Sequence, residues 1–219
     1  MRDTVQYPAI PAYVCNASPE TLGVEVSTRE HTANLNFDLV SGPDDPVRRN
    51  RQARRIARRL AAVETEAFVR MIIGRGIPMS GQGIGQEVYG NLEPALLNMM
   101  FRLIEQHDLL VTAVVIHSGD VPEFTKRFSA SHIDRAPSSK YPLVGHLWTS
   151  DILCSDAPSL AGHAMCFAAP DYVGACPIRS DVELKFKSDK GQVRVQASSD
   201  IGMIIMNDFA TSWATYKME

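Results

Sequence analysis

Hydrophobic and polar residues alternate with a period of two in two stretches near the start of the chain. The apolar positions of these stretches, on either side of a polar connection at residues 28–33, are Leu22, Val24, Val26, Leu35, Phe37 and Leu39. This pattern predicts a β-hairpin. A two-stranded ribbon is only marginally stable in water, so we expect the hairpin to pack on a surface outside its own chain. The proline-marked residues 1–13 predict an extended arm that needs a partner surface for the same reason.

A helical period replaces the alternation after a turn at residues 41–46. Asp45 suits the N-cap of a helix and Pro46 its first position. Apolar residues then recur at helical spacing over residues 47–73, at Ala53, Ile56, Ala57, Leu60, Val63, Ala67 and Phe68. The spacing predicts one continuous helix about 40 Å long. Part of so long a helix must cross or leave a compact domain.

Two further helices and a buried strand are predicted after the glycine-rich loop that ends the long helix. The helices cover residues 92–107 and 121–128, and Ser118 or Asp120 is the expected cap of the second one. Between them, residues 109–117 form a near-continuous apolar run. Such a run predicts a strand that is buried on both faces.

The last third of the chain is rich in strand patterns. After a polar loop at 129–140, the predicted strands are residues 143–148, 163–168, 182–187, 192–197 and 202–206. The turn residues 188–191 predict that the third and fourth of these strands form a hairpin. The chain therefore belongs to the α+β class.

Charge is distributed unevenly along the chain. The 219 residues carry a net charge of −3, and 45% of them are hydrophobic, which is typical of a folded globular protein rather than a disordered one. The mildly acidic total argues against a general polyanion binder. Residues 48–59, however, contain seven arginines and no acidic residue.

The arginines fall mainly on one side of the predicted long helix. Arg48, Arg51, Arg55 and Arg58 share a face, and Arg54 and Arg59 flank the apolar stripe. Guanidinium groups this close repel one another unless anions compensate. The sequence leaves two interpretations open: a solvated face or ion pairs with acidic residues of neighbouring chains, or contact with nucleic-acid phosphates, which needs charge but no base-specific code.

No motif for catalysis, metal binding or membrane insertion is present. Cys15, Cys154, Cys166 and Cys176 form no C-x-x-C pair, and we expect them to be reduced and mostly buried. His163 lies three positions before Cys166 in a predicted strand, so the two side chains point to opposite faces. The N-terminus has no signal-peptide pattern, and no apolar run is long enough to span a bilayer. The sequence predicts a protein that is not an enzyme and needs no cofactor or metal.

The order of predicted elements resembles that of the HK97-type major capsid proteins of tailed bacteriophages. That order is an arm, a long β-hairpin, a long helix, a glycine break, a helix, an apolar strand, a short helix and a β-rich segment. The stretches 103–117, 141–146, 169–174 and 200–207 look like corresponding segments of that family. The resemblance covers most of the chain.

The resemblance implies an HK97-like capsid fold with a specific division of the chain. It implies an N-terminal arm at 1–19, an extended-loop hairpin at 20–45, a peripheral domain with its spine helix at 46–117, an axial domain at 118–168, and a return to both sheets at 169–219. In this family the arm and the hairpin lie over neighbouring subunits. The implied function is a major capsid protein that forms pentamers and hexamers of an icosahedral shell around double-stranded DNA. Its implied place is the virion capsid, assembled in the host cytoplasm.

Two departures from the family sharpen this expectation. Some relatives crosslink their shells through an extended-loop lysine, whereas the first lysine of this chain is Lys126. The predicted hairpin therefore cannot supply that crosslink, and non-covalent overlap or a separate cement protein would strengthen the shell. The hairpin also begins near residue 20, so scaffolding is expected from a separate protein, alongside a portal protein.

Two alternatives stay open at this point. One is an encapsulin-like nanocompartment shell, which would enclose protein cargo instead of DNA. The other is a small arginine-rich regulator that binds nucleic acid, which predicts a discrete dimer and strongly salt-dependent binding.

Overall fold

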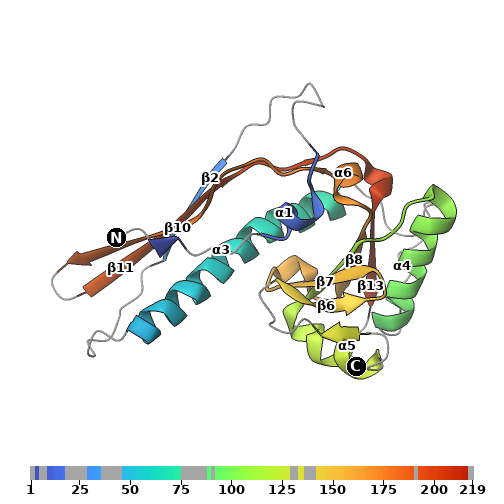
Figure 1. The fold of residues 1–219 in the computed structure, drawn as a ribbon, viewed down its shortest axis with the longest axis horizontal. Helices are drawn as coiled ribbons and strands as arrows, with labels where there is room; N and C mark the ends of the chain where they lie inside the picture. Colours follow the sequence, from blue (N-terminus) through green and yellow to red (C-terminus); the bar gives the residue numbers. More distant parts are fainter. Residues whose placement is uncertain are drawn as a thin grey trace.

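The protein folds into a compact part and an elongated part (Figure 1). The computed structural model describes residues 3–4, 9–17, 29–35, 46–74, 88–89, 92–128, 133–135, 142–189 and 192–216. A seven-stranded sheet with flanking helices forms the compact part. In the elongated part, one long helix lies beside a long β-hairpin that runs away from the compact part.

The seven-stranded sheet has the strand order β3-β13-β8-β4-β7-β6-β5. The bounds are β3 Val88–Tyr89, β4 Ala113–His117, β5 Ile133–Arg135, β6 Leu143–Leu147, β7 Ser150–Ser155, β8 His163–Phe167 and β13 Thr211–Tyr216. The central strand β4 is parallel to β7 and antiparallel to β8. The last strand of the described chain, β13, lies between β3 and β8, to which it is parallel and antiparallel, respectively.

Strand β4 separates two hydrophobic cores. Val114 and Ile116 pack with the helices α4 Leu92–His107 and α5 Val121–Arg127 on one face of the sheet. Val115 packs on the other face with the C-terminal half of α3. Because both faces are covered, the successive residues 113–116 of β4 are all apolar, which explains the continuous apolar run in the sequence.

The elongated part consists of α3 Pro46–Gly74 and a four-stranded antiparallel sheet. The sheet has the order β1-β10-β11-β2, with bounds β1 Asp3–Thr4, β2 Arg29–Leu35, β10 Ile178–Asp189 and β11 Gln192–Ile201. Helix α3 packs against β10 and β11. The buried carboxylate of Glu64 in α3 accepts a hydrogen bond from the Ser199 hydroxyl in β11 and so ties the helix to the sheet.

Several short elements complete the described chain. They are α1 Pro11–Val14, α6 Pro170–Val173, β9 Gly174–Ala175, β12 Ile204–Ile205 and the 3-10 helices η1 Ser118–Asp120, η2 Pro158–Leu160 and η3 Asp208–Ala210. Strand β9 pairs with β12 so closely that a Cβ atom at Gly174 would lie 1.9 Å from the Ile204 carbonyl oxygen. Only glycine fits at position 174, because any Cβ atom would clash with the backbone of β12.

The predicted helices agree closely with the structure. Helix α3 begins at Pro46 and continues to Gly74, α4 has the predicted bounds 92–107, and α5 lies within the predicted 121–128. Asp120 occupies the N-cap position of α5, but its side chain makes no cap hydrogen bond. The predicted hairpin at 188–191 is also confirmed, since Asp189 lies opposite Gln192 in the β10–β11 pair.

The structure differs from the predicted N-terminal hairpin in the segment expected to connect its two strands. Residues 29–33, expected to be a polar connection, belong to strand β2, and this strand pairs with β11. Leu35 ends β2 opposite Val195. The other predicted hairpin positions, Leu22, Val24, Val26, Phe37 and Leu39, lie outside the described residues.

Two other expectations differ from the structure. The predicted extended arm is helical at Pro11–Val14, where Ile10 and Val14 are buried in the chain's own core. The strand predicted over 109–117 begins only at Ala113. The burial of Ile10 and Val14 is a tertiary contact that the local pattern does not record.

Candidate functional site

The N-terminal half of α3 carries a row of arginines on its exposed side. We call Arg51, Arg54, Arg55, Arg58 and Arg59 the arginine row, and all five side chains are exposed. Arg48 lies near the start of the same helix, but its side chain is not among the described ones. The structure therefore places five of the six predicted charge candidates on one surface.

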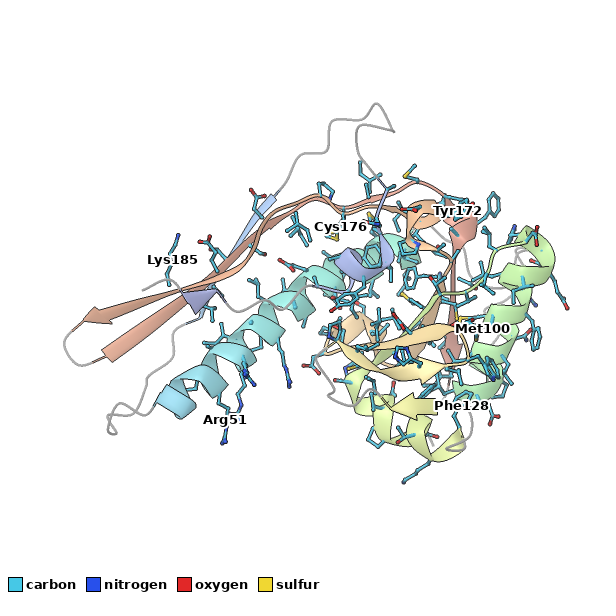
Figure 2. All side chains as sticks on the ribbon, viewed as in Figure 1. Arg51, Met100, Phe128, Tyr172, Cys176 and Lys185 are labelled. Atoms are coloured by element: carbon cyan, nitrogen blue, oxygen red, sulfur yellow. The ribbon has the colours of Figure 1, made fainter. Side chains whose placement is uncertain are left out.

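The opposite side of this half of α3 is apolar and buried. Ala53, Ile56, Ala57 and Leu60 recur at helical spacing and are 3% exposed or less. This side covers β10 and β11, whereas Figure 2 shows Arg51 pointing away from that hairpin. Amphipathic spacing thus explains both the position of the helix and the direction of its charges.

The buried side of α3 shifts around the helix toward its C-terminal end. Phe68, Val69 and Ile72 are buried in the core that also contains Phe167 and Trp213 of the seven-stranded sheet. The ring centroids of Phe68 and Phe167 are 5.8 Å apart. One half of α3 is thereby anchored in the compact part, and the half that carries the arginine row extends from it (Figure 2).

Two members of the arginine row, Arg58 and Arg59, interact with other groups of the same chain. Burial and the nearby Asp156 raise the pKa of the Cys154 thiol in β7 to about 11, and Arg58 opposes this effect. Arg58 and Arg59 both have interaction partners in the chain. Within the described part of the chain, Arg51, Arg54 and Arg55 form no ion pair with a carboxylate. Their charge is available to a partner outside those residues.

Helix α3 is fixed to the compact part by a second polar contact. The Glu66 carboxylate accepts hydrogen bonds from the backbone N–H of Ser159, at 2.7 Å, and from its hydroxyl, and it pairs with Arg70. Burial raises the pKa of Glu66, but these three partners outweigh it and the pKa is lowered overall. The charged form of Glu66 therefore holds η2 against the helix.

The histidines and cysteines form no chemical site among the described residues. His163 is half-buried and 5.7 Å from the Trp213 ring, while Cys166 is fully buried on the opposite face of β8. Burial raises the pKa of the Cys166 thiol. The Nδ1 atom of His146 lies 2.7 Å from an Asp151 oxygen, a pair that the sequence did not indicate.

Among the described residues, no group of three or more potential metal ligands lies together. The helices of the described ranges include none with the length and apolar character needed to cross a bilayer.

A second surface was missed in the sequence because its residues come from three distant segments. Tyr172 in α6 and Phe209 in η3 are 58% and 59% exposed, and Met206 lies between them in the chain. The Phe209 ring packs on His107 at the end of α4, with centroids 4.9 Å apart. Exposed aromatic residues gathered in this way are typical of an interaction surface.

The sequence matches neither a protein-family model nor a curated protein. Solved structures do match its fold. A structure titled Mycobacterium phage Che8 matches with a TM-score of 0.51 and 12% identity, over 99% of this chain and 93% of the other. One titled Microbacterium phage Oxtober96 matches with a TM-score of 0.54 and 12% identity, over 88% and 73%. The chain has the fold of phage capsid proteins.

A third match is a structure titled "Capsid of empty GTA particle computed with C5 symmetry", with 15% identity and a TM-score of 0.48 over 88% of this chain and 74% of the other. The predicted resemblance to HK97-type capsid proteins is confirmed for the fold. In this capsid fold, the arginine row lies on the elongated part and the aromatic surface lies on the compact part (Figure 2).

Proposed function

We propose that the protein is the structural subunit of an icosahedral shell that encloses double-stranded DNA. The observation that carries this proposal is the capsid fold, which the match to a phage structure extends over 99% of the chain. The proposed assembly contains pentamers and hexamers of this chain in a virion capsid. It forms in the host cytoplasm with separate scaffolding and portal proteins, and either non-covalent overlap or a cement protein takes the place of crosslinks.

The exposed apolar surface supports self-assembly. Large hydrophobic residues are exposed at several places on the compact part, including Phe101, Ile104, Leu110, Trp148, Tyr172 and Phe209. Burying such surface between copies contributes about 25 cal/mol per Å². Many weak, identical contacts then make a shell stable through multivalency. The predicted hairpin positions at 20–45 would add intersubunit contacts of the same kind.

The arginine row suits a container for nucleic acid. Contact with phosphates requires positive charge but no base recognition, and only the inner surface of a shell meets the DNA. A net charge of −3 with one concentrated arginine face is compatible with that arrangement. Two locations of the arginine row in the shell are consistent with this function: the inner surface, or the contact between subunits.

Negative-stain electron microscopy of the purified chain tests the shell. Closed particles of uniform diameter are expected, and a stable monomer or dimer in size-exclusion chromatography at high concentration would overturn the proposal. The ratio of absorbance at 260 and 280 nm, measured on nuclease-treated particles, tests the DNA content. A protein-like ratio would instead indicate protein cargo, as in an encapsulin-like compartment.

Replacing arginines tests the contact with DNA. The variant Arg51→Gln/Arg55→Gln/Arg58→Gln removes three positive charges from exposed positions. If the row lies at the inner surface, particles of this variant will hold less DNA than wild-type particles. Normal particles with a full DNA content would refute a DNA-binding role for the row.

A further inference from the structure

The exposed aromatic surface of the compact part is also acidic. Asp171 precedes Tyr172 in α6, Asp208 precedes Phe209 in η3, and Asp108 follows α4. Neither α6 nor η3 contains a lysine or arginine, whereas α4 contributes Arg102. Arg102 and Asp208 both have interaction partners within the chain, so Asp108 and Asp171 supply the acidic character of this surface. We call Asp108, Asp171, Asp208, Tyr172 and Phe209 the acidic-aromatic surface.

Hydrogen bonds and ring contacts hold these residues in fixed positions. The backbone N–H of Met206 donates to the Val173 carbonyl at 2.9 Å, which joins α6 to the segment before η3. The Phe209 N–H donates to the Asn207 side chain at 3.0 Å, and its ring packs on His107. Asp108 has a φ of 53° and closes the end of α4, where its N–H donates to the Ile104 carbonyl. The surface is therefore preformed in the single chain.

The arginine row has the complementary composition. Arg51, Arg54 and Arg55 lie at helical positions i, i+3 and i+4, so they present one face, and no carboxylate of the described residues pairs with them. Guanidinium groups bind carboxylates and also stack on aromatic rings. The exposed Asp108 and Asp171 beside two exposed aromatic rings match both properties.

The two surfaces of one chain cannot meet each other. Figure 2 shows Arg51 near the end of α3 that extends from the compact part, whereas Tyr172 lies on the compact part, far along the long axis of the molecule. A contact between them must therefore join two copies. Such a contact is head-to-tail, and it generates a ring when the rotation between copies closes.

We propose that the arginine row of one copy docks on the acidic-aromatic surface of a second copy, through Arg51, Arg54 and Arg55. This inference rests on the proposed self-assembly and places the row between subunits, not against DNA. Tyr172 and Phe209 supply flat apolar contact at the centre of the interface, and Asp108 and Asp171 neutralise the guanidinium groups.

Charge reversal tests the contact. The variants Arg54→Glu/Arg55→Glu and Asp171→Lys/Asp208→Lys each place like charges opposite one another. Each variant is expected to need about tenfold more protein than wild type to form particles, which corresponds to about 1.4 kcal/mol. The chain with all four substitutions restores the opposite charges and is expected to assemble as wild type does. Lys126→Glu/Lys185→Glu is a control that changes the charge of exposed positions by the same amount as the arginine variant.

The measurement is the fraction of assembled protein in sedimentation velocity over a range of concentrations. Thermal melting of each unassembled variant checks that it is folded, and Asp171→Lys alone serves if Asp208→Lys unfolds the chain. Recovery in the fourfold variant supports the contact. Normal assembly of Arg54→Glu/Arg55→Glu overturns it, and normal particles that lose nucleic acid assign these arginines to DNA instead. If wild-type protein itself does not assemble, the proposed shell function fails. If wild type assembles and Arg54→Glu/Arg55→Glu assembles equally well, only the proposed contact fails.

Discussion

The Tyr216 hydroxyl donates a hydrogen bond to the carboxylate of Asp120, 96 residues earlier in the chain. Both residues are buried, and the contact joins the end of β13 to the start of α5. The other oxygen of Asp120 is buried without a partner among the described residues. Burial, followed by the hydrogen bond and the charge of Asp120, raises the pKa of Tyr216, so the hydroxyl stays protonated and continues to donate.

Replacing Tyr216 with Phe should destabilise the fold. The substitution removes the donor and leaves the buried Asp120 carboxylate without this bond, at a cost of about 1–3 kcal/mol in the free energy of unfolding. Chemical denaturation monitored by circular dichroism measures the loss. Tyr172→Phe is the matched control, because Tyr172 is 58% exposed, and it should change stability by less than about 0.5 kcal/mol. Equal effects in both variants would contradict the role of the buried bond.

Replacing Phe68 with Ala should weaken the attachment of α3 to the compact part. Phe68 is 1% exposed and its ring stacks on Phe167, so truncation leaves a cavity at the junction of helix and sheet. A loss of about 3–5 kcal/mol in unfolding free energy is expected. Val63→Ala, at a position of α3 that is 52% exposed, should have almost no effect. A Phe68→Ala protein as stable as Val63→Ala would show that the junction does not depend on this packing.

The contact of Glu66 with Ser159 and Arg70 should make stability depend on pH. The folded-state pKa of Glu66 is lowered, so its ionised form stabilises the folded state at pH values above the ordinary pKa of 4.5. This contribution disappears as the pH falls through the folded-state pKa. Glu66→Gln should therefore lower the melting temperature near neutral pH and approach wild type in acid. A difference between the two proteins that is constant from about pH 7 to about pH 3 would contradict this assignment.

Adding a methyl group at Gly174 should disrupt the pairing of β9 with β12. The new Cβ atom would lie 1.9 Å from the Ile204 carbonyl oxygen, which is backbone and cannot rotate away. Gly174→Ala is expected to cost at least about 1–3 kcal/mol, as in overpacked cores. Gly74→Ala is the matched control, since it meets no atom within 4 Å at the end of α3 and should be neutral or stabilising. Thermal melts of the two variants should therefore move in different directions.

Local periodicity explains which elements the sequence predicts well. The apolar residues of α4, including Leu96, Met99 and Leu103, recur every three or four positions because one side of the helix is buried. The turn between β10 and β11 is recognised from the residues of the turn alone. The arginine row is likewise visible, because its members lie within a few turns of one helix.

Strands β2 and β13 were missed for a different reason. Residues 29–35 form β2 by hydrogen bonding to β11, whose pairs include Ala33 with Ala197 and Leu35 with Val195. The polar side chains of β2 carry no local signal of a partner so distant in sequence. Strand β13 contains buried Thr211 and Ser212 beside Trp213, so its polar residues obscure its burial.

The local sequence pattern predicts the helices, the buried central strand and the arginine face, since each depends on residues that are neighbours in the chain. Only the tertiary structure decided the pairing of β2 with β11, the anchoring of α3 by Phe68, and the acidic-aromatic surface, which collects Asp108, Asp171 and Asp208 from three segments. The physical reason is that hydrogen bonds between strands and packing between layers join residues that lie far apart in the chain. A local pattern records that a side chain is buried or charged, but not which distant group it meets.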